Sequence, residues 1–163
     1  DASVIDIQDE LAAGNGYYQE FGYQHDYSEK LVLQYLAAYK RYSLSFENSS
    51  YSIESYPLTT LLVYRFNAIS IGGGLTYHIN PRYKSRGVNN DAAEFNNALG
   101  VSTVVNFQLT KSDLFSIQIR HTYIKYRGAN TPEGDTTSTL TRSRTKYNAS
   151  NLAVFAVFRF GAF

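Results

Sequence analysis

The stretch of residues 69–80, ISIGGGLTYHIN, decides the fold class because its side chains alternate between two kinds without a break. One set is mainly apolar and the other is small or polar: Ile69, Ile71, Gly73, Leu75, Tyr77, Ile79 and Ser70, Gly72, Gly74, Thr76, His78, Asn80. Successive side chains of a β-strand point to opposite faces. A period of two therefore predicts a strand with one apolar and one polar face.

The same alternation recurs in seven further segments: residues 4–11, 16–26, 31–40, 56–66, 99–109, 115–123 and 151–160. No long segment has the 3.6-residue period of a helix, and no run of 18 apolar residues could form a transmembrane helix. We therefore predict an all-β chain of about eight strands that forms a single domain over residues 1–163. A chain of this length can bury a core without disulfides, and it contains no Cys.

The connections between these segments differ in length in a regular way. Residues 27–30, 67–68 and 110–113 are short links, whereas residues 42–50, 81–92 and 127–148 are long and polar. The short link at residues 14–16 is an exception on the long-loop side. Short turns at one rim, long loops at the other and both termini beside the short turns are typical of outer-membrane barrels.

We therefore predict a closed antiparallel up-and-down transmembrane β-barrel of about eight strands in the outer membrane of a Gram-negative bacterium. Its termini would be periplasmic and its long loops extracellular. The chain begins at Asp1 without an apolar leader, so we expect it to be a processed, exported form.

Alternation alone does not say which face is outside, because a soluble up-and-down barrel such as a lipocalin has its apolar face inside. Three features favour an outward apolar face. The other face is rich in Gly, Ser, Thr and Asn, which fit a narrow interior. Tyr and Phe recur near strand ends on the apolar face, where interfacial aromatic girdles lie. The chain also ends in Phe163, and a strand that closes on a terminal Phe resembles the recognition signal of outer-membrane barrels. We expect Leu75 and Phe107 to point outward.

Three sequence stretches together carry a family resemblance: residues 56–59 (YPLT), 63–66 (VYRF) and 71–77 (IGGGLTY). In these residue types, and in the alternation over most of the chain, the protein resembles the small outer-membrane β-barrels of the opacity-type superfamily. The resemblance implies the barrel fold and specifies no activity.

A narrower resemblance is to the lipid A deacylases of the same fold. Ile119-Arg120-x-Thr122, followed by Gly128 and Pro132, is similar to the strand and loop where those enzymes carry a His-x-Ser pair. The matching positions here are Tyr123 and Lys125, or Lys125 and Arg127 in a shifted frame. The base and the nucleophile are missing, so the resemblance does not carry the activity over.

The polar face holds charges that a narrow barrel would enclose. They are the acids Asp6, Glu10 and Glu20 and the bases Lys40, Arg65, Arg120 and Arg159. An unpaired buried charge costs several kcal/mol, so we expect these groups to form a network that fills the interior. An eight-stranded barrel leaves an interior just wide enough for side chains, so we expect a closed lumen.

The predicted long loops carry basic residues: Arg82, Lys84, Arg86, Arg127, Arg142, Arg144 and Lys146. Ordinary solvated loop charge would explain them. The sharper hypothesis is that they contact phosphates of the surrounding glycolipid, lipopolysaccharide.

Other chemistry finds little support in the sequence. The three His residues lack ligand spacing, and none has a Ser and a carboxylate at a defensible distance, so we predict no metal, no cofactor and no catalytic residue. The net charge of +1 argues against nucleic acid. We expect a non-enzymatic barrel that acts through its loops, or as an accessory or structural subunit of an envelope assembly with a protein partner. The alternatives are a lipid A-modifying hydrolase and a narrow pore or small-molecule conduit.

Overall fold

The computed structural model describes residues 16–46, 49–86, 92–110, 115–127, 129–130 and 146–159. Within these ranges the chain contains strands and no helix. The strands are β1 (Gly16–Asp26), β2 (Leu31–Phe46), β3 (Ser49–Phe66), β4 (Ile69–Arg86), β5 (Ala92–Phe95), β6 (Ala98–Gln108), β7 (Phe115–Tyr123), β8 (Lys125–Arg127), β9 (Ala129–Asn130), β10 (Lys146–Asn148) and β11 (Asn151–Phe158).

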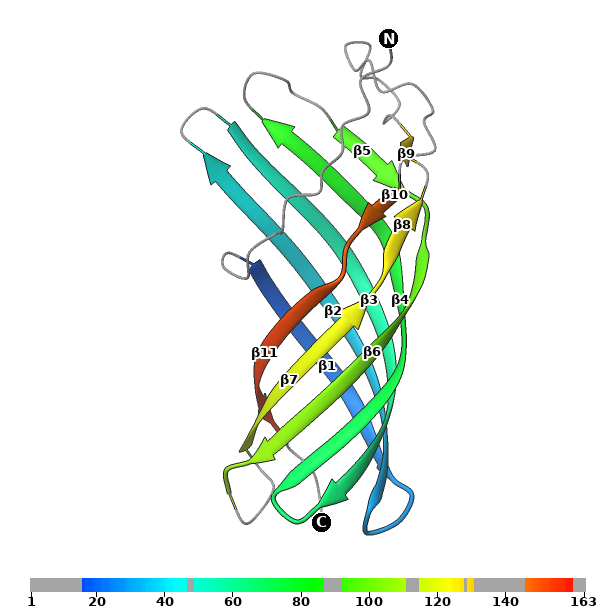
Figure 1. The fold of residues 1–163 in the computed structure, drawn as a ribbon, viewed down its shortest axis with the longest axis vertical. Coiled ribbons are helices and arrows are strands. Elements are labelled where there is room, and N and C mark those ends of the chain that lie inside the picture. Colours follow the sequence, from blue (N-terminus) through cyan, green and yellow to red (C-terminus); the bar gives the residue numbers. More distant parts are fainter. Residues whose placement is uncertain are drawn as a thin grey trace.

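Seven long strands form one antiparallel sheet in the order β1-β2-β3-β4-β6-β7-β11 (Figure 1). Almost every long strand pairs with its neighbour in sequence, as in an up-and-down meander. At one end of the sheet, β5 pairs with β4 and β9, and β8 pairs with β10. We call this the upper end, and the end with the β1–β2 and β3–β4 turns the lower end.

The predicted strand positions are confirmed where the structure describes them, but all three predicted long loops contain strand residues. In the loop predicted over residues 127–148, Arg127 ends β8 and Lys146 begins β10. β2 continues past residue 40 to Phe46, and β3 begins at Ser49. β4 continues past Asn80 to Arg86, so Arg82, Lys84 and Arg86 lie on a strand and not in a loop. The extension of β4 has Arg82, Lys84 and Arg86 on one face and Tyr83 and Ser85 on the other, so the backbone stays paired where the apolar alternation stops.

A β-bulge lets β4 continue through a proline. The register between β3 and β4 shifts between Glu54 and Tyr56, and Asn80 has a φ of 45°, which lies in the left-handed region. Proline has no backbone N–H and is tolerated in strands at bulges, where the ladder is interrupted. Pro81 therefore occupies the bulge without ending the strand.

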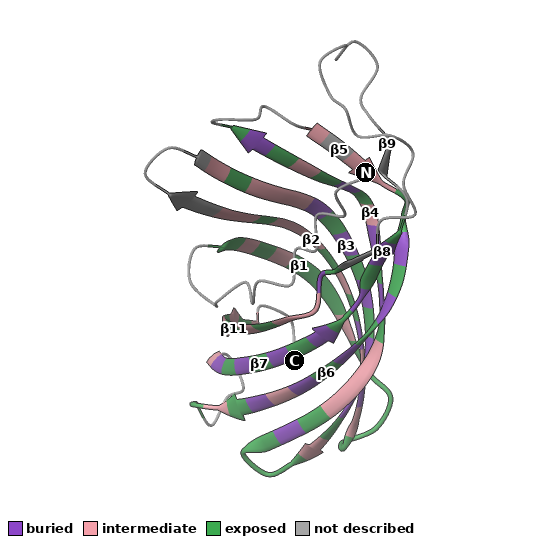
Figure 2. Cartoon of the chain, turned by 45° about the horizontal axis from the view of Figure 1, so that its top comes forward, coloured by how far each residue is buried: buried purple, intermediate pink, exposed green. Residues whose placement is uncertain are grey.

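The sheet exposes its apolar face and buries its polar face (Figure 2). Leu75 is 55% exposed and Phe107 is 38% exposed, as expected. Their strand neighbours Thr76 and Asn106 are both 2% exposed. The sheet curls round the polar face, so the chain has the reverse of the usual polarity of a soluble protein.

Glycines on the inner face allow the sheet to curl closely. A Cβ added to Gly74 would collide with the backbone carbonyl oxygen of Thr60, and one on Gly72 would lie 2.5 Å from the carbonyl oxygen of Leu62. Both positions pair with β3. The small residues of the polar face therefore bring β3 and β4 into close backbone contact.

The two end strands of the sheet are not paired with each other. Among the described residues, β1 pairs only with β2 and β11 only with β7. The sheet is thus a curled half-barrel. The segment predicted as the first strand, residues 4–11, lies outside the described residues, as do residues 131–145 and 160–163.

Candidate functional site

The strongest polar contact of the inner face is an ion pair between β7 and β1, which lie near opposite edges of the sheet. Arg120 on β7 donates through Nη1 to Glu20 Oε2 at 2.6 Å and through Nη2 to Glu20 Oε1 at 2.8 Å. The guanidinium also donates to Gln118 and lies 5.0 Å from the centroid of the Phe155 ring. Arg120 is buried, so this two-pronged pair satisfies a charge that would otherwise be costly.

The other predicted network residues are distributed differently. Arg65 pairs with Asp26 at the lower end, at 3.2 Å, and not with Glu20. Lys40 faces inward on β2 and has no carboxylate partner among the described residues. Arg159 is half-buried just after β11. Asp6 and Glu10 lie outside the described residues.

Hydroxyl and amide pairs fill more of the inner face. Thr59 bonds Thr76 at 2.9 Å, Ser102 bonds Thr122 at 3.0 Å, and Gln118 Nε2 donates to Asn106 at 2.7 Å. Two apolar clusters lie among them: Val32, Leu61, Val63 and Val104, and, nearer the upper end, Ala98, Ile124, Tyr126 and Ala149. The inner face is therefore covered by packed side chains that bond one another.

A buried His–Tyr pair lies at the upper end of the inner face. His78 Nδ1 is 2.7 Å from the hydroxyl of Tyr126 on β8, and both side chains are buried. Burial raises the pKa of Tyr126 to about 12, although a hydrogen bond with Ser55 lowers it. The phenol therefore stays protonated near neutral pH. Sequence reasoning missed this pair because residue 127 was taken as the start of a loop and Tyr126 carried no strand signal of its own.

The outer face has two rows of aromatic residues. Near the upper end an upper girdle comprises Tyr17, Tyr39, Tyr56, Tyr77 and Tyr123, and near the lower turns a lower girdle comprises Tyr64, Phe66, Phe107 and Phe158. Ring centroids of Tyr39 lie 6.3 Å from Tyr17 and 5.6 Å from Tyr56. Tyr56 and Phe66 on β3 mark the two limits of the apolar band. With a rise of ~3.3 Å per residue along the strand and a strand tilt of ~40° typical of barrels, this band is about 25 Å tall.

Exposed cations lie just above the upper girdle and form what we call the basic collar: Arg41, Arg82, Lys84, Arg86, Lys125 and Arg127. Arg41 pairs with Glu54 at 3.5 Å, and Arg82 pairs with Glu94 at 2.9 Å. The remaining four have no carboxylate partner among the described residues. Lys125 lies 5.3 Å from the centroid of the Tyr123 ring.

Of the predicted phosphate contacts, Arg82, Lys84, Arg86 and Arg127 thus come together in the collar. Lys146 lies on β10, but its side chain is not described, and Arg142 and Arg144 lie outside the described residues. Sequence reasoning missed Arg41 and Lys125. Their spacing from Tyr39 and Tyr123, two residues in each case, is a signal that could have found them.

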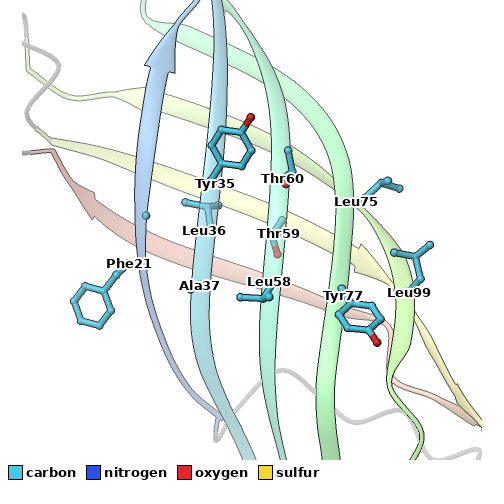
Figure 3. A pocket seen from close by; sticks show the side chains of 11 residues that line it. Phe21, Tyr35, Leu36, Ala37, Leu58, Thr59, Thr60, Leu75, Tyr77 and Leu99 are labelled. Carbon is cyan, nitrogen blue, oxygen red and sulfur yellow. The ribbon is translucent and has the colours of Figure 1, made fainter.

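A shallow groove of about 490 Å³ crosses the outer face below the collar (Figure 3). Phe21 and Tyr35 lie toward one side and Leu75, Tyr77 and Leu99 toward the other. The smaller side chains of Ala37 and Thr60 lie between them on β2 and β3. The lining is mostly apolar, and the volume falls in the range of small-ligand pockets.

The residues that align with the deacylase pair lie on the outer face. Tyr123, Lys125 and Arg127 are all exposed, and so is His121. Among the described residues, no group of three or more His, Cys, Asp or Glu side chains could hold a metal ion. No helix in the described part of the chain is long and apolar enough to cross a membrane.

Neither a family model, nor a curated protein sequence, nor a solved structure shows significant similarity to the chain.

Proposed function

We propose that the chain is a closed outer-membrane β-barrel whose outer face contacts hydrocarbon. The observation that carries this proposal is the exposed apolar band between the two aromatic girdles. Soluble monomers rarely expose contiguous apolar patches larger than a few hundred Å². Transmembrane barrels have an outward apolar band about 25 Å tall with aromatic girdles at both interfaces.

Within that membrane the barrel acts without catalysis, through its upper end or as an accessory or structural subunit of an envelope assembly. The packed inner face supports this role, because the Arg120–Glu20 pair and the two apolar clusters occupy the space that a pore would need. The deacylase positions carry no His or Ser.

The partner that the outer face fits best is an anionic glycolipid such as lipopolysaccharide. The basic collar lies above the upper girdle, where lipid phosphates would lie, and each Lys or Arg near an anionic lipid surface contributes about 1 kcal/mol. The groove below the collar is lined mainly by apolar side chains, which one acyl chain of the lipid would contact. The phosphates and one acyl chain of the same lipid would thus both bind the outer face of the sheet.

Lipid retention tests this proposal. The triple variant Lys84→Ser, Arg86→Ser and Arg127→Ser removes three collar cations that have no carboxylate partner among the described residues, and Lys30→Ser in the lower turn is the matched control. We expect the full chain expressed in a Gram-negative host to fractionate with the outer membrane. Lipopolysaccharide that co-purifies in mild detergent should fall several-fold in the triple variant and stay unchanged in the control. Equal retention in all three proteins would contradict the glycolipid assignment, and a freely soluble monomer would contradict the membrane assignment.

Two further measurements separate the alternative functions. Mass spectrometry of lipid A from expressing cells would reveal an acyl chain lost to a hydrolase, and we expect unmodified lipid A. Planar-bilayer recordings would reveal a pore, and we expect no steady conductance. Either activity would replace the non-enzymatic role.

A further inference from the structure

Lys40 is an inward cation on β2 whose charge has no acid beside it in the described part of the chain. The strand register places its side chain between Tyr18 on β1 and Ser55 on β3. Its ammonium group forms no ion pair with any described carboxylate. An enclosed charge without a counter-charge is costly. Lys40 therefore calls for an anion.

The nearest acid along β1 is fully engaged elsewhere. Glu20 lies two residues from Tyr18, and its two carboxylate oxygens accept from Arg120 at 2.6 and 2.8 Å. Glu20 therefore balances the charge of Arg120 and not that of Lys40. Together these three groups leave one positive charge on the upper half of the inner face.

A chain of buried polar side chains lies next to Lys40. Ser55 forms a hydrogen bond with the hydroxyl of Tyr126, which lies 2.7 Å from Nδ1 of His78. All three side chains are buried, whereas Lys40 is only half-buried and can be reached by a small ion. The charge of Lys40 acts on the His78 ring, so the two groups lie close together. With the phenol donating to Nδ1, the neutral ring carries its proton on Nε2 and can donate from there.

These groups lie level with the upper girdle. Lys40 follows Tyr39 along β2, and His78 follows Tyr77 along β4. A ligand would therefore approach from the upper end of the inner face, and would not need to cross the apolar cluster of Val32, Leu61, Val63 and Val104.

We propose that Lys40 and His78 form a binding site for a small free carboxylate. A carboxylate has two acceptor oxygens, one for the ammonium group of Lys40 and one for Nε2 of His78. Its single negative charge matches the one positive charge that Glu20 leaves unbalanced. A phosphate dianion would leave a net negative charge there, and a neutral amide would leave the ammonium group unbalanced.

Protection of Lys40 from reductive methylation tests the site in the unmodified full chain. The probe is sodium acetate, compared with sodium chloride at equal ionic strength and with neutral acetamide, and peptide mass spectrometry measures the modification of each lysine. We expect acetate to slow the modification of Lys40 several-fold and acetamide to have no effect. The exposed Lys30 in the lower turn is the internal reference and should react equally in all three solutions.

A carboxylate side chain from another part of the chain is the competing source of the anion. In that case Lys40 would react slowly in chloride alone and acetate would change nothing, which would overturn the proposal. A Lys40 that reacts at the rate of Lys30 in every solution would overturn it as well.

Variants test the two contacts separately by saturation-transfer NMR of the acetate methyl group. We expect Lys40→Met to abolish the signal, His78→Phe to weaken it several-fold, and Lys30→Met to retain it. Far-ultraviolet circular dichroism checks that each variant keeps its strands. An unchanged signal in Lys40→Met would place acetate elsewhere, and an unchanged signal in His78→Phe would refute the second contact. The same measurements apply in detergent or in water, so they stand apart from whether hydrocarbon contacts the outer face.

Discussion

Replacing Leu62 by Arg tests whether hydrocarbon or water surrounds the outer face. Leu62 lies on β3 between Tyr56 and Phe66, one residue from the midpoint of the apolar band. At a rise of about 2.5 Å per residue along the membrane normal, it lies about 10 Å above Phe66 and about 15 Å below Tyr56. Tyr56 on the same strand provides the control, because Leu62 and Tyr56 are each 50% exposed.

In a bilayer the two substitutions should differ strongly. An Arg on the lipid face costs about 2–4 kcal/mol near the midplane and about 0–1 kcal/mol near an interface. In water, both positions are equally exposed surface, where substitutions usually change stability by less than about 0.5 kcal/mol. We therefore expect Leu62→Arg to lower the free energy of unfolding by about 1–4 kcal/mol more than Tyr56→Arg.

The measurement is reversible urea unfolding in lipid vesicles, followed by far-ultraviolet circular dichroism, because the chain has no Trp. The folded and unfolded forms can also be separated by electrophoretic mobility. Losses of stability that agree within about 0.5 kcal/mol would refute the argument, since depth would then have no effect.

Two further predictions concern the inner face. Glu20→Ala should destabilise the protein by about 3–5 kcal/mol because it leaves the buried guanidinium of Arg120 without its partner, whereas Glu54→Ala, in a more exposed pair, should cost about 0.2–1 kcal/mol. Urea unfolding measures both, and equal losses would show that the inner pair is solvated. Gly74→Ala should reduce the folded fraction because its Cβ meets the Thr60 carbonyl oxygen, whereas Gly73→Ala has room, with its nearest atom at 3.4 Å. Electrophoretic mobility of the refolded proteins compares them, and equal yields would contradict the close approach of β3 and β4.

Much of the fold could be predicted because alternation and short turns are local signals. The turn at residues 67–68 links two alternating runs, and Asn67 adopts the left-handed conformation, with a φ of 48°, that such a tight turn favours. The ends of the strands could not be predicted in the same way. Residues 82–86 are polar on both faces, so nothing in their sequence distinguishes a paired strand from a loop.

The site could be predicted less well than the fold. Alternation placed Glu20, Lys40 and Arg120 on one face, but the partner that each finds depends on how far neighbouring strands are staggered. That stagger brings Arg120 to Glu20 and leaves Arg65 beside Asp26, although Asp26 shares the alternation of Glu20 and was available to the same reasoning. Tyr126 was missed because it follows residue 123, where the strand predicted from the alternation ends, and lies on the separate short strand β8.

The extension of β2, β3 and β4 beyond the upper girdle has a consequence for recognition at the upper end. These segments are already ordered by backbone pairing, as between Ile53 and Tyr83. A molecule that binds there would contact a backbone that is already ordered. Less conformational entropy would therefore be lost on association than on binding to a flexible loop. Grafted peptides or altered side chains on this ribbon would accordingly keep their geometry.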